Sequence, residues 1–127
     1  MPSATTEGIR ITVQPAYWRE RSSPTTGLYA FTYTIRIENV GEAPAQLLRR
    51  HWFILDGNGK EEEVEGPGVV GKQPYLAPGE SFEYTSWVPL STPIGTMKGH
   101  FLMSRDDGEL FEAEVPEFVL TQPDALH

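Results

Sequence analysis

The sequence predicts an all-β protein, a seven-stranded antiparallel β-sandwich of the immunoglobulin or fibronectin type III kind. Three observations favour this fold class. Seven segments alternate apolar and polar residues with a period of two, turn signals separate them at fairly regular spacing, and no segment has a convincing helical pattern. The Cys-Trp-Cys core of true immunoglobulin domains is missing, because the chain has no cysteine.

The N-terminal third predicts a polar tail, two strands and a loop between them. Residues 1–8 form the tail, and the alternation over residues 9–13 predicts the first strand. Residues 17–27 break the pattern with a proline and a glycine, so we expect an irregular loop there. Residues 28–39 give the clearest strand, because apolar and polar residues alternate as in a sheet with one buried face.

Residues 45–55 are compatible with a strand or a helix, because Leu48, Trp52 and Leu55 also fit one helical face. We expect a strand, since the run ends in β-favouring residues and the hairpin-type sequence Asp-Gly-Asn-Gly follows it. In a strand, one face carries Leu48, Arg50, Trp52 and Ile54, and the other carries Arg49, His51, Phe53 and Leu55.

The second half predicts four more strands joined by tight turns. The charged segment 60–65 returns from the hairpin turn, and its glutamates discourage pairing with a second molecule at a sheet edge. Pro78-Gly79 predicts a type II turn with Gly79 at positive φ. Gly99 lies within a predicted strand and indicates a bulge or a close approach of two backbones. The remaining strands are expected over residues 81–88, 96–105 and 110–120.

Length and composition describe a single globular domain over residues 1–127, with an ordered core of about residues 8–120. No apolar run is long enough to cross a bilayer, and the N-terminus lacks the features of a secretory signal. The absence of cysteine excludes disulfides and thiolate chemistry. We therefore expect a cytoplasmic protein without a membrane partner.

The net charge of −8 is unevenly distributed. Residues 1–60 carry seven Lys and Arg against five Asp and Glu, or +2, whereas residues 61–127 carry three against thirteen, or −10. A surface of this sign repels phosphate backbones, so general nucleic-acid binding is not expected. The C-terminal excess of acid is interpreted as a solubilising surface.

Residues 64–74, Val-Glu-Gly-Pro-Gly-Val-Val-Gly-Lys-Gln-Pro, are the most unusual segment of the chain. They match the Gly-x-Gly-x-x-Gly spacing of dinucleotide-binding folds, but that fingerprint requires a helix after the glycines. Gln73-Pro74 favours extended backbone at this point, so no such helix is expected.

Three interpretations stay open for this loop. Its glycines fit a structural turn with positive φ, a concavity of amides that binds an anion, or a docking surface for a protein. We expect Val69 and Val70 to be exposed beside Tyr75 as an apolar patch. The candidate binding residues are Gly66, Gly68, Val69, Val70, Gly71, Lys72 and Tyr75, with Arg49 and Arg50 as supports for an anion.

No catalytic reaction can be assigned, so we expect a protein that is not an enzyme and needs no cofactor. No serine lies in a Gly-x-Ser-x-Gly elbow, and the glutamates of residues 61–65 are interpreted as a solvated edge. His51 and His100 need a third ligand to hold a metal, and none is evident, so no metal site is predicted. Residues 56–61 lack the ligand spacing of a calcium loop and predict a tight turn instead.

Several ordered stretches resemble one known family. They are Arg49-Arg-His-Trp52 with Asp56-Gly-Asn-Gly59, the loop 64–74, Leu76-Ala-Pro-Gly-Glu80 with Phe82-Glu-Tyr-Thr-Ser86, Gly95-Thr-Met-Lys-Gly99, and Phe111-Glu-Ala-Glu-Val-Pro-Glu-Phe118. In this order they closely resemble the ApaG family, and the resemblance covers nearly the whole chain.

The resemblance implies a bacterial cytoplasmic protein with a fibronectin type III-like sandwich. It also implies gene neighbours that encode a diadenosine tetraphosphatase and an rRNA dimethyltransferase, and in some members an association with magnesium and cobalt handling. Similar domains in eukaryotic F-box proteins and in a polymerase-interacting protein look like interaction modules. No catalytic residues are established for the family, so none are carried over.

Our first functional hypothesis is a non-enzymatic binding module that engages a protein partner through residues 66–75. The alternative is that the same loop binds a pyrophosphate-containing nucleotide or a divalent cation. Both hypotheses use the same residues and differ in the ligand.

Overall fold

The computed structural model describes residues 1–123 of the chain. No helix among these residues is long and apolar enough to cross a membrane. Residues 1–123 form nine strands and two single-turn 3-10 helices: β1 Ser3–Thr6, β2 Ile9–Tyr17, η1 Arg19–Arg21, η2 Pro24–Thr26, β3 Tyr29–Asn39, β4 Ala45–Asp56, β5 Glu61–Pro67, β6 Tyr75–Leu76, β7 Ser81–Leu90, β8 Ile94–Ser104 and β9 Leu110–Thr121.

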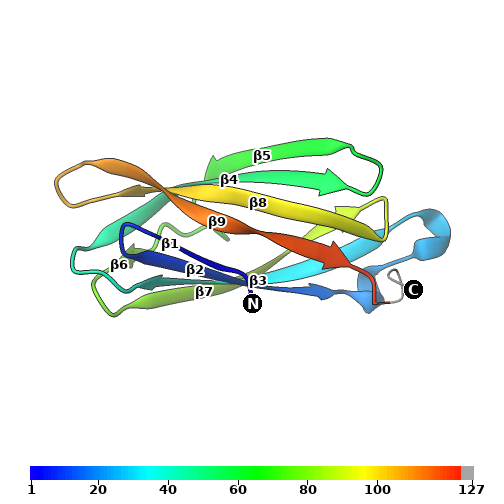
Figure 1. Cartoon of the computed structure of the whole chain (residues 1–127), viewed down its shortest axis with the longest axis horizontal. Helices are drawn as coiled ribbons and strands as arrows, with labels where there is room; N and C mark the ends of the chain where they lie inside the picture. The colour runs from blue at the N-terminus through cyan, green and yellow to red at the C-terminus, as the bar shows by residue number, and fades with distance from the viewer. Residues whose placement is uncertain (124–127) are drawn as a thin grey trace.

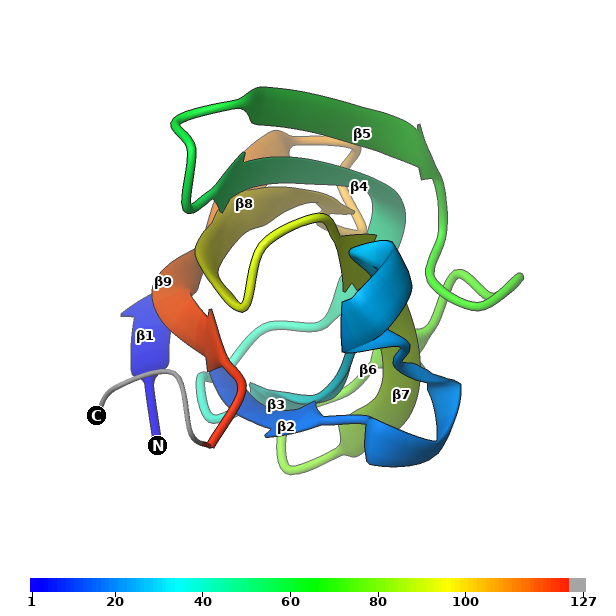
Figure 2. The ribbon, with the colours of Figure 1, turned by 90° about the vertical axis from the view of Figure 1, so that its right-hand side faces the viewer.

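Two antiparallel sheets pack face to face (Figure 1). The first sheet has the order β1-β2-β3-β7, and the second has the order β5-β4-β8-β9, with β6 paired to the start of β4. Seen from one end, the two sheets curve around a common core (Figure 2). The predicted antiparallel β-sandwich is confirmed, with nine strands instead of the expected seven.

The core follows the alternation that the sequence predicts. β3 lies between β2 and β7, and its apolar residues point into the sandwich while its threonines lie on the other face. Since burial of each large apolar side chain contributes about 1.5–3 kcal/mol, this strand is a main source of stability. Its fully or nearly fully buried residues include Phe31, Tyr33, Ile35 and Ile37.

The N-terminal residues differ from the expected tail, because residues 3–6 form strand β1 along the edge of the first sheet. Glu7 and Gly8 connect β1 to β2 with φ values of 46° and 83°, which are typical of a tight hairpin turn. Thr6 also contacts β9, since its hydroxyl accepts a hydrogen bond from the amide of Glu114 at 3.1 Å. Sequence patterning misses this strand because its four residues are nearly all polar or small.

The strand prediction for residues 45–55 is confirmed, but one assigned face is wrong. The register of β4 against β8 shifts between Leu47 and Arg49, which marks a bulge at Leu48. Because the bulge adds one residue, Leu47 instead of Leu48 joins Trp52 and Ile54 on the buried face. A strict period of two cannot predict this offset.

The predicted turns are present. The amide of Asp56 donates to the carbonyl of Lys60 at 3.0 Å, which closes the β4–β5 hairpin. The amide of Glu80 donates to the carbonyl of Ala77 at 2.9 Å, and Gly79 has a φ of 87°. The expected irregularity at Gly99 is confirmed by a register shift in the β8–β9 pairing, and a side chain there would collide with the carbonyl oxygen of His51.

Candidate functional site

The glycine loop, residues 66–75, is anchored at both ends to the bulged part of β4. The amide of Gly68 donates to the carbonyl of Leu48 at 2.9 Å, and the side-chain amide of Gln73 donates to the same oxygen at 3.0 Å. The amide of Leu47 donates to the carbonyl of Pro74 at 3.0 Å. These contacts hold the loop as a fixed extension of the second sheet.

The tip of the loop is a tight turn from Val69 to Lys72. The amide of each end residue donates to the carbonyl of the other, at 2.8 and 2.9 Å. The central residues Val70 and Gly71 have φ values of 43° and 78°, the pattern of a type I′ turn. Positive φ is rare for a β-branched residue and costs about 1–3 kcal/mol, so Val70 is held in a strained conformation.

The two valines of the loop are not exposed together. Val69 is wholly buried in the core, whereas Val70 is 53% exposed. The expectation of a joint patch is therefore wrong for Val69, since the turn points consecutive side chains to opposite sides. Tyr75 is half-exposed, and its hydroxyl donates to the carboxylate of Asp106 at 2.9 Å.

Hydrogen bonding to the acidic Asp106 raises the pKa of Tyr75 above its ordinary value, and burial adds to the effect. The phenol is therefore a hydrogen-bond donor at neutral pH. Next to Tyr75, residues 72–76 and the start of β7 border a shallow groove of about 390 Å³.

The two arginines do not converge on the loop as supports for an anion. Arg50 donates from one guanidinium nitrogen to the carbonyls of Pro67 and Gly68, at 2.9 and 3.1 Å. Its guanidinium also lies against Gly66, where an added Cβ would lie 3.1 Å from it. Arg49 lies on the opposite face of β4 and is exposed. Arg50 therefore acts on the loop backbone, and Arg49 is a surface residue.

Several amides of the loop are already used. Those of Gly68, Val69 and Lys72 donate to backbone carbonyls, and Gly66 lies in the ladder opposite Arg50. The adjacent amides of Val70 and Gly71 at the tip, and that of Gln73 after it, have no acceptor among residues 1–123. No helix follows the glycines, as expected, so the amides do not form the phosphate cradle of a dinucleotide-binding fold.

Two buried tyrosines lie on the inner side of the sandwich near Arg50. The Tyr84 hydroxyl has no hydrogen-bond partner within the described part of the chain. Burial raises the pKa of both Tyr33 and Tyr84, and the charge of Arg50 lowers it to a smaller extent. Both phenols are consequently neutral and belong to the core.

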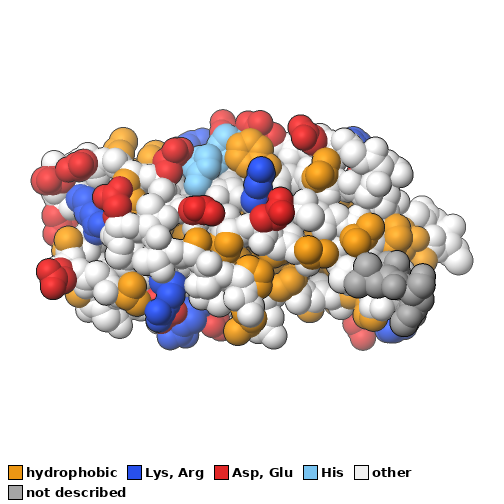
Figure 3. Space-filling model, viewed as in Figure 1, with side chains coloured by type: hydrophobic (Ala, Val, Ile, Leu, Met, Phe, Trp, Pro, Cys, Tyr) orange, Lys and Arg blue, Asp and Glu red, His pale blue; other side chains and the backbone are white. Residues whose placement is uncertain are grey.

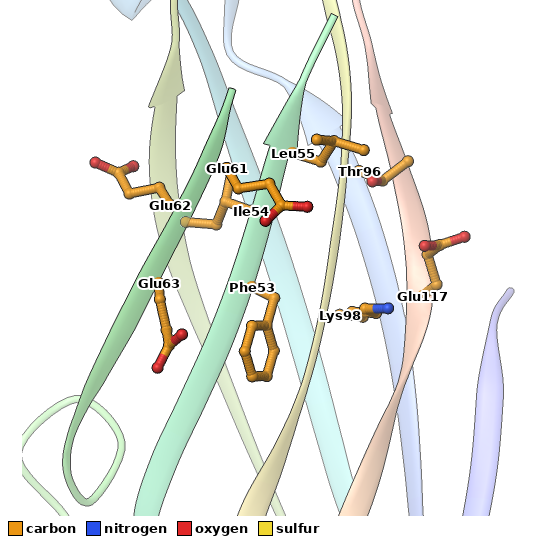
Figure 4. Close-up of a pocket in the computed structure, with 9 residues that line it drawn as sticks. All are labelled: Phe53, Ile54, Leu55, Glu61, Glu62, Glu63, Thr96, Lys98 and Glu117. Atoms are coloured by element: carbon orange, nitrogen blue, oxygen red, sulfur yellow. The ribbon is translucent and has the colours of Figure 1, made fainter. Parts of the chain in front are cut away.

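The outer face of the second sheet is a second candidate region. A hollow of about 570 Å³ lies on this face, and residues of β5, β4, β8 and β9 line it (Figure 4). In this view Phe53 lies between Glu63 of β5 and Lys98 of β8, and Glu117 of β9 lies beyond Lys98. His51 stacks on Phe53 with ring centroids 4.5 Å apart.

Sequence reasoning missed the ligand set that surrounds His51. Glu63 and Glu65 from β5 contact the two ring nitrogens, at 2.9 and 3.2 Å. The signal was present in the hairpin turn, because pairing Asp56 with Lys60 places His51 opposite Glu65. Two of the glutamates interpreted as a solvated edge thus supply the partners that His51 lacked.

Comparison with known proteins gives consistent matches. The ApaG domain model matches residues 19–105. Protein ApaG of Dechloromonas aromatica is 58% identical over 124 residues, covering 96% of this chain and 98% of that protein. Protein ApaG of Anaeromyxobacter dehalogenans strain 2CP-C is 53% identical over 127 residues, covering 100% of both. The crystal structure of the ApaA protein from Bordetella pertussis has a TM-score of 0.89 and 48% identity, covering 98% of each chain.

Proposed function

This chain belongs to the ApaG domain family, and we propose that it is a non-enzymatic binding module that engages a protein partner through the tip of the glycine loop. The observation that carries the proposal is Val70. It is an apolar side chain that is 53% exposed and held at a φ of 43°. Glycine or asparagine would occupy this position without strain, so folding alone does not account for a valine.

The rigidity of the tip supports recognition. Both hydrogen bonds of the Val69–Lys72 turn and the anchoring contacts to Leu48 fix the backbone on either side of Val70. A preorganised loop loses little conformational entropy on binding, so a small apolar contact contributes more of its interaction energy to affinity. Tyr75, which borders the groove beside the loop, is an amphipathic residue of the type that is enriched at binding hot spots.

The proposal is tested by replacing Val70 with serine and capturing partners from a native lysate. The matched control is Val119→Ser, because Val119 is 51% exposed on β9, outside the loop. We expect V70S to lose at least one protein that the wild type and V119S retain. Identical partner sets for the three proteins contradict a role for the loop tip.

Binding of a pyrophosphate-containing nucleotide at the same loop is the second candidate. It is favoured by the two unpartnered amides of Val70 and Gly71 and by the exposed Lys72 beside them. Titration with diadenosine tetraphosphate, with and without Mg²⁺, would then shift the amide resonances of residues 70–72. Unchanged resonances in both titrations would contradict binding of the nucleotide and of the cation at this loop.

The absence of an enzymatic role and the cytoplasmic location are part of the same proposal. Among residues 1–123, neither the loop nor the groove next to it brings a nucleophile, a base and an orienting group together. A binding surface without such a constellation fits recognition better than bond making. The magnesium and cobalt association that the family resemblance implies stays a prediction.

A further inference from the structure

Four residues on four adjacent strands form a row across the outer face of the second sheet. Glu65 of β5 lies opposite His51 of β4, His51 opposite His100 of β8, and His100 opposite Glu114 of β9. Directly opposed residues in antiparallel strands point to the same face, so the two imidazoles lie side by side with a carboxylate at each end of the row. Figure 3 shows the histidine side chains side by side with acidic side chains around them.

In the neutral form of His51, its contacts leave one carboxylate without a proton donor. Its Nε2 lies 2.9 Å from a Glu63 oxygen, and its Nδ1 lies 3.2 Å from a Glu65 oxygen. A neutral imidazole carries a single N–H, so it can donate to only one of the two. The other carboxylate then faces the ring lone pair, an arrangement that a bound cation would stabilise.

We propose that His51 and one of its two glutamates bind a divalent first-row transition-metal ion at this face. The ligand atoms of His51, Glu63 and Glu65 all lie within 4.8 Å of one another. The second glutamate accepts the N–H of the ring nitrogen that does not bind the metal. This carboxylate–imidazole–metal arrangement fixes the ring and raises the basicity of the ligating nitrogen.

The distances fit chelation without rearrangement of the strands. Two ligand atoms that each lie about 2.0 Å from a tetrahedral ion are about 3.3 Å apart. The Nδ1–Glu65 separation is 3.2 Å and the Nε2–Glu63 separation is 2.9 Å, so changes of a few tenths of an ångström suffice. The glutamates are 57% exposed or more, so their carboxylates can adjust and an ion can enter from solvent.

His100 supplies the nearest further nitrogen. Its ring centroid lies 4.9 Å from that of His51, and its Nε2 lies 2.9 Å from a Glu112 oxygen. Within residues 1–123, its Nδ1 has no hydrogen-bond partner. Imidazole nitrogen with carboxylate oxygen suits Zn²⁺, Ni²⁺ and Cu²⁺, whereas Mg²⁺ prefers oxygen ligands and water.

The site is tested with Zn²⁺ and Ni²⁺ as probes and Mg²⁺ as the selectivity control. All proteins carry His127→Gln, so that His51 and His100 are the remaining histidines. Calorimetry measures affinity, and NMR of the imidazole nitrogens reports which rings bind. We expect one Zn²⁺ per chain, shifts at the His51 ring, and no response to Mg²⁺.

His51→Gln is expected to weaken Zn²⁺ binding by at least tenfold, because loss even of groups that orient metal ligands costs 10–100-fold. The second test variant is the double substitution Glu63→Gln/Glu65→Gln, and the control is Glu83→Gln, which removes a carboxylate from the first sheet. We expect E83Q to bind as the parent does and the double variant to lose binding. If His51→Gln does not fold, the double variant carries the test.

Two outcomes overturn the proposal: no heat and no imidazole shifts with either transition metal, or binding that the His51 and double-glutamate variants leave unchanged. The first outcome assigns the row to ion pairing at the surface alone. The site is separate from the loop tip, so V70S leaves Zn²⁺ binding intact, and failure of either proposal does not affect the other.

Discussion

The glycine loop and the outer face of the second sheet both contact β4, yet they use their polar groups in opposite ways. In the loop, the amides on both sides of the tip and the Arg50 guanidinium donate to internal carbonyls. On the described part of the sheet face, imidazoles pair with carboxylates, and the carboxylates stay open to solvent. The glycine loop and Arg50, which look most like a ligand site in the sequence, therefore mainly stabilise the backbone. Glu63 and Glu65, which look like a solvated edge, lie next to His51 as potential metal ligands.

The largest expected effect tests the structural half of this comparison. At Gly68, a Cβ would lie 2.5 Å from the carbonyl oxygen of Lys72, and the φ is 63°. We expect Gly68→Ala to lower the free energy of unfolding by about 3 kcal/mol, because backbone strain and a steric clash combine. Urea denaturation measures the loss.

Gly71→Ala is the matched control for this prediction. Gly71 has a φ of 78°, but a Cβ there would meet no atom within 4 Å. Only the conformational cost remains, which is about 1 kcal/mol. Equal losses for the two variants would show that the close approach of Gly68 to Lys72 does not hold the loop.

The second prediction compares the two neighbouring arginines. Arg50→Ala removes the charged donor from the carbonyls of Pro67 and Gly68, which share one guanidinium nitrogen, and hydrogen bonds to charged groups contribute about 1.5–3 kcal/mol. We expect a loss of about 2 kcal/mol in unfolding free energy for this variant. Arg49→Ala, on the exposed face, should stay within about 0.5 kcal/mol of the wild type in the same urea titration.

A similar loss for both arginine variants would contradict the division between the two faces of β4. It would mean that Arg49 also stabilises the fold, through the acidic side chains of the outer face. The outer face of the second sheet would then be a structural ion-pair network.

The fold was largely predictable because its signals are local. Alternation located seven of the strands, and the Asp-Gly-Asn-Gly and Pro-Gly pairs located two turns correctly. The sequence pattern did not predict β1, because its four polar or small residues show no alternation of apolar and polar types. It did not predict the bulge at Leu48, because the bulge depends on the pairing of β4 with β8. Features set by partners distant in sequence leave little trace in the segment itself.

The same limit applies to the candidate sites. Positions 69 and 70 carry the same residue type, valine, and the turn geometry alone decides that Val69 is buried and Val70 is exposed. The approach of His51 to Glu65 follows from a hairpin register and was within reach of sequence reasoning. The approach of His51 to His100 joins strands that are far apart in the chain, so no local pattern indicates it.

The smallest expected effect concerns the same substitution, valine to asparagine, at two positions, where the free energy of unfolding should change with opposite sign. Val70→Asn creates the Asn-Gly pair that type I′ turns favour, and it relieves a β-branched residue at a φ of 43°. We expect it to raise the free energy of unfolding by about 1 kcal/mol. Val119→Asn replaces an equally exposed valine in β9, where β-branched residues are favoured, and should lower it by up to about 1 kcal/mol.

Opposite signs for the two asparagine variants, measured by urea denaturation in one buffer, would show that the fold tolerates Val70 at a cost. Loss of a partner from the stabilised V70N protein would then link that cost to recognition, since lower stability could not explain the loss. If V70N instead destabilises the protein, Val70 is not strained, and the reason for assigning it to a binding surface disappears.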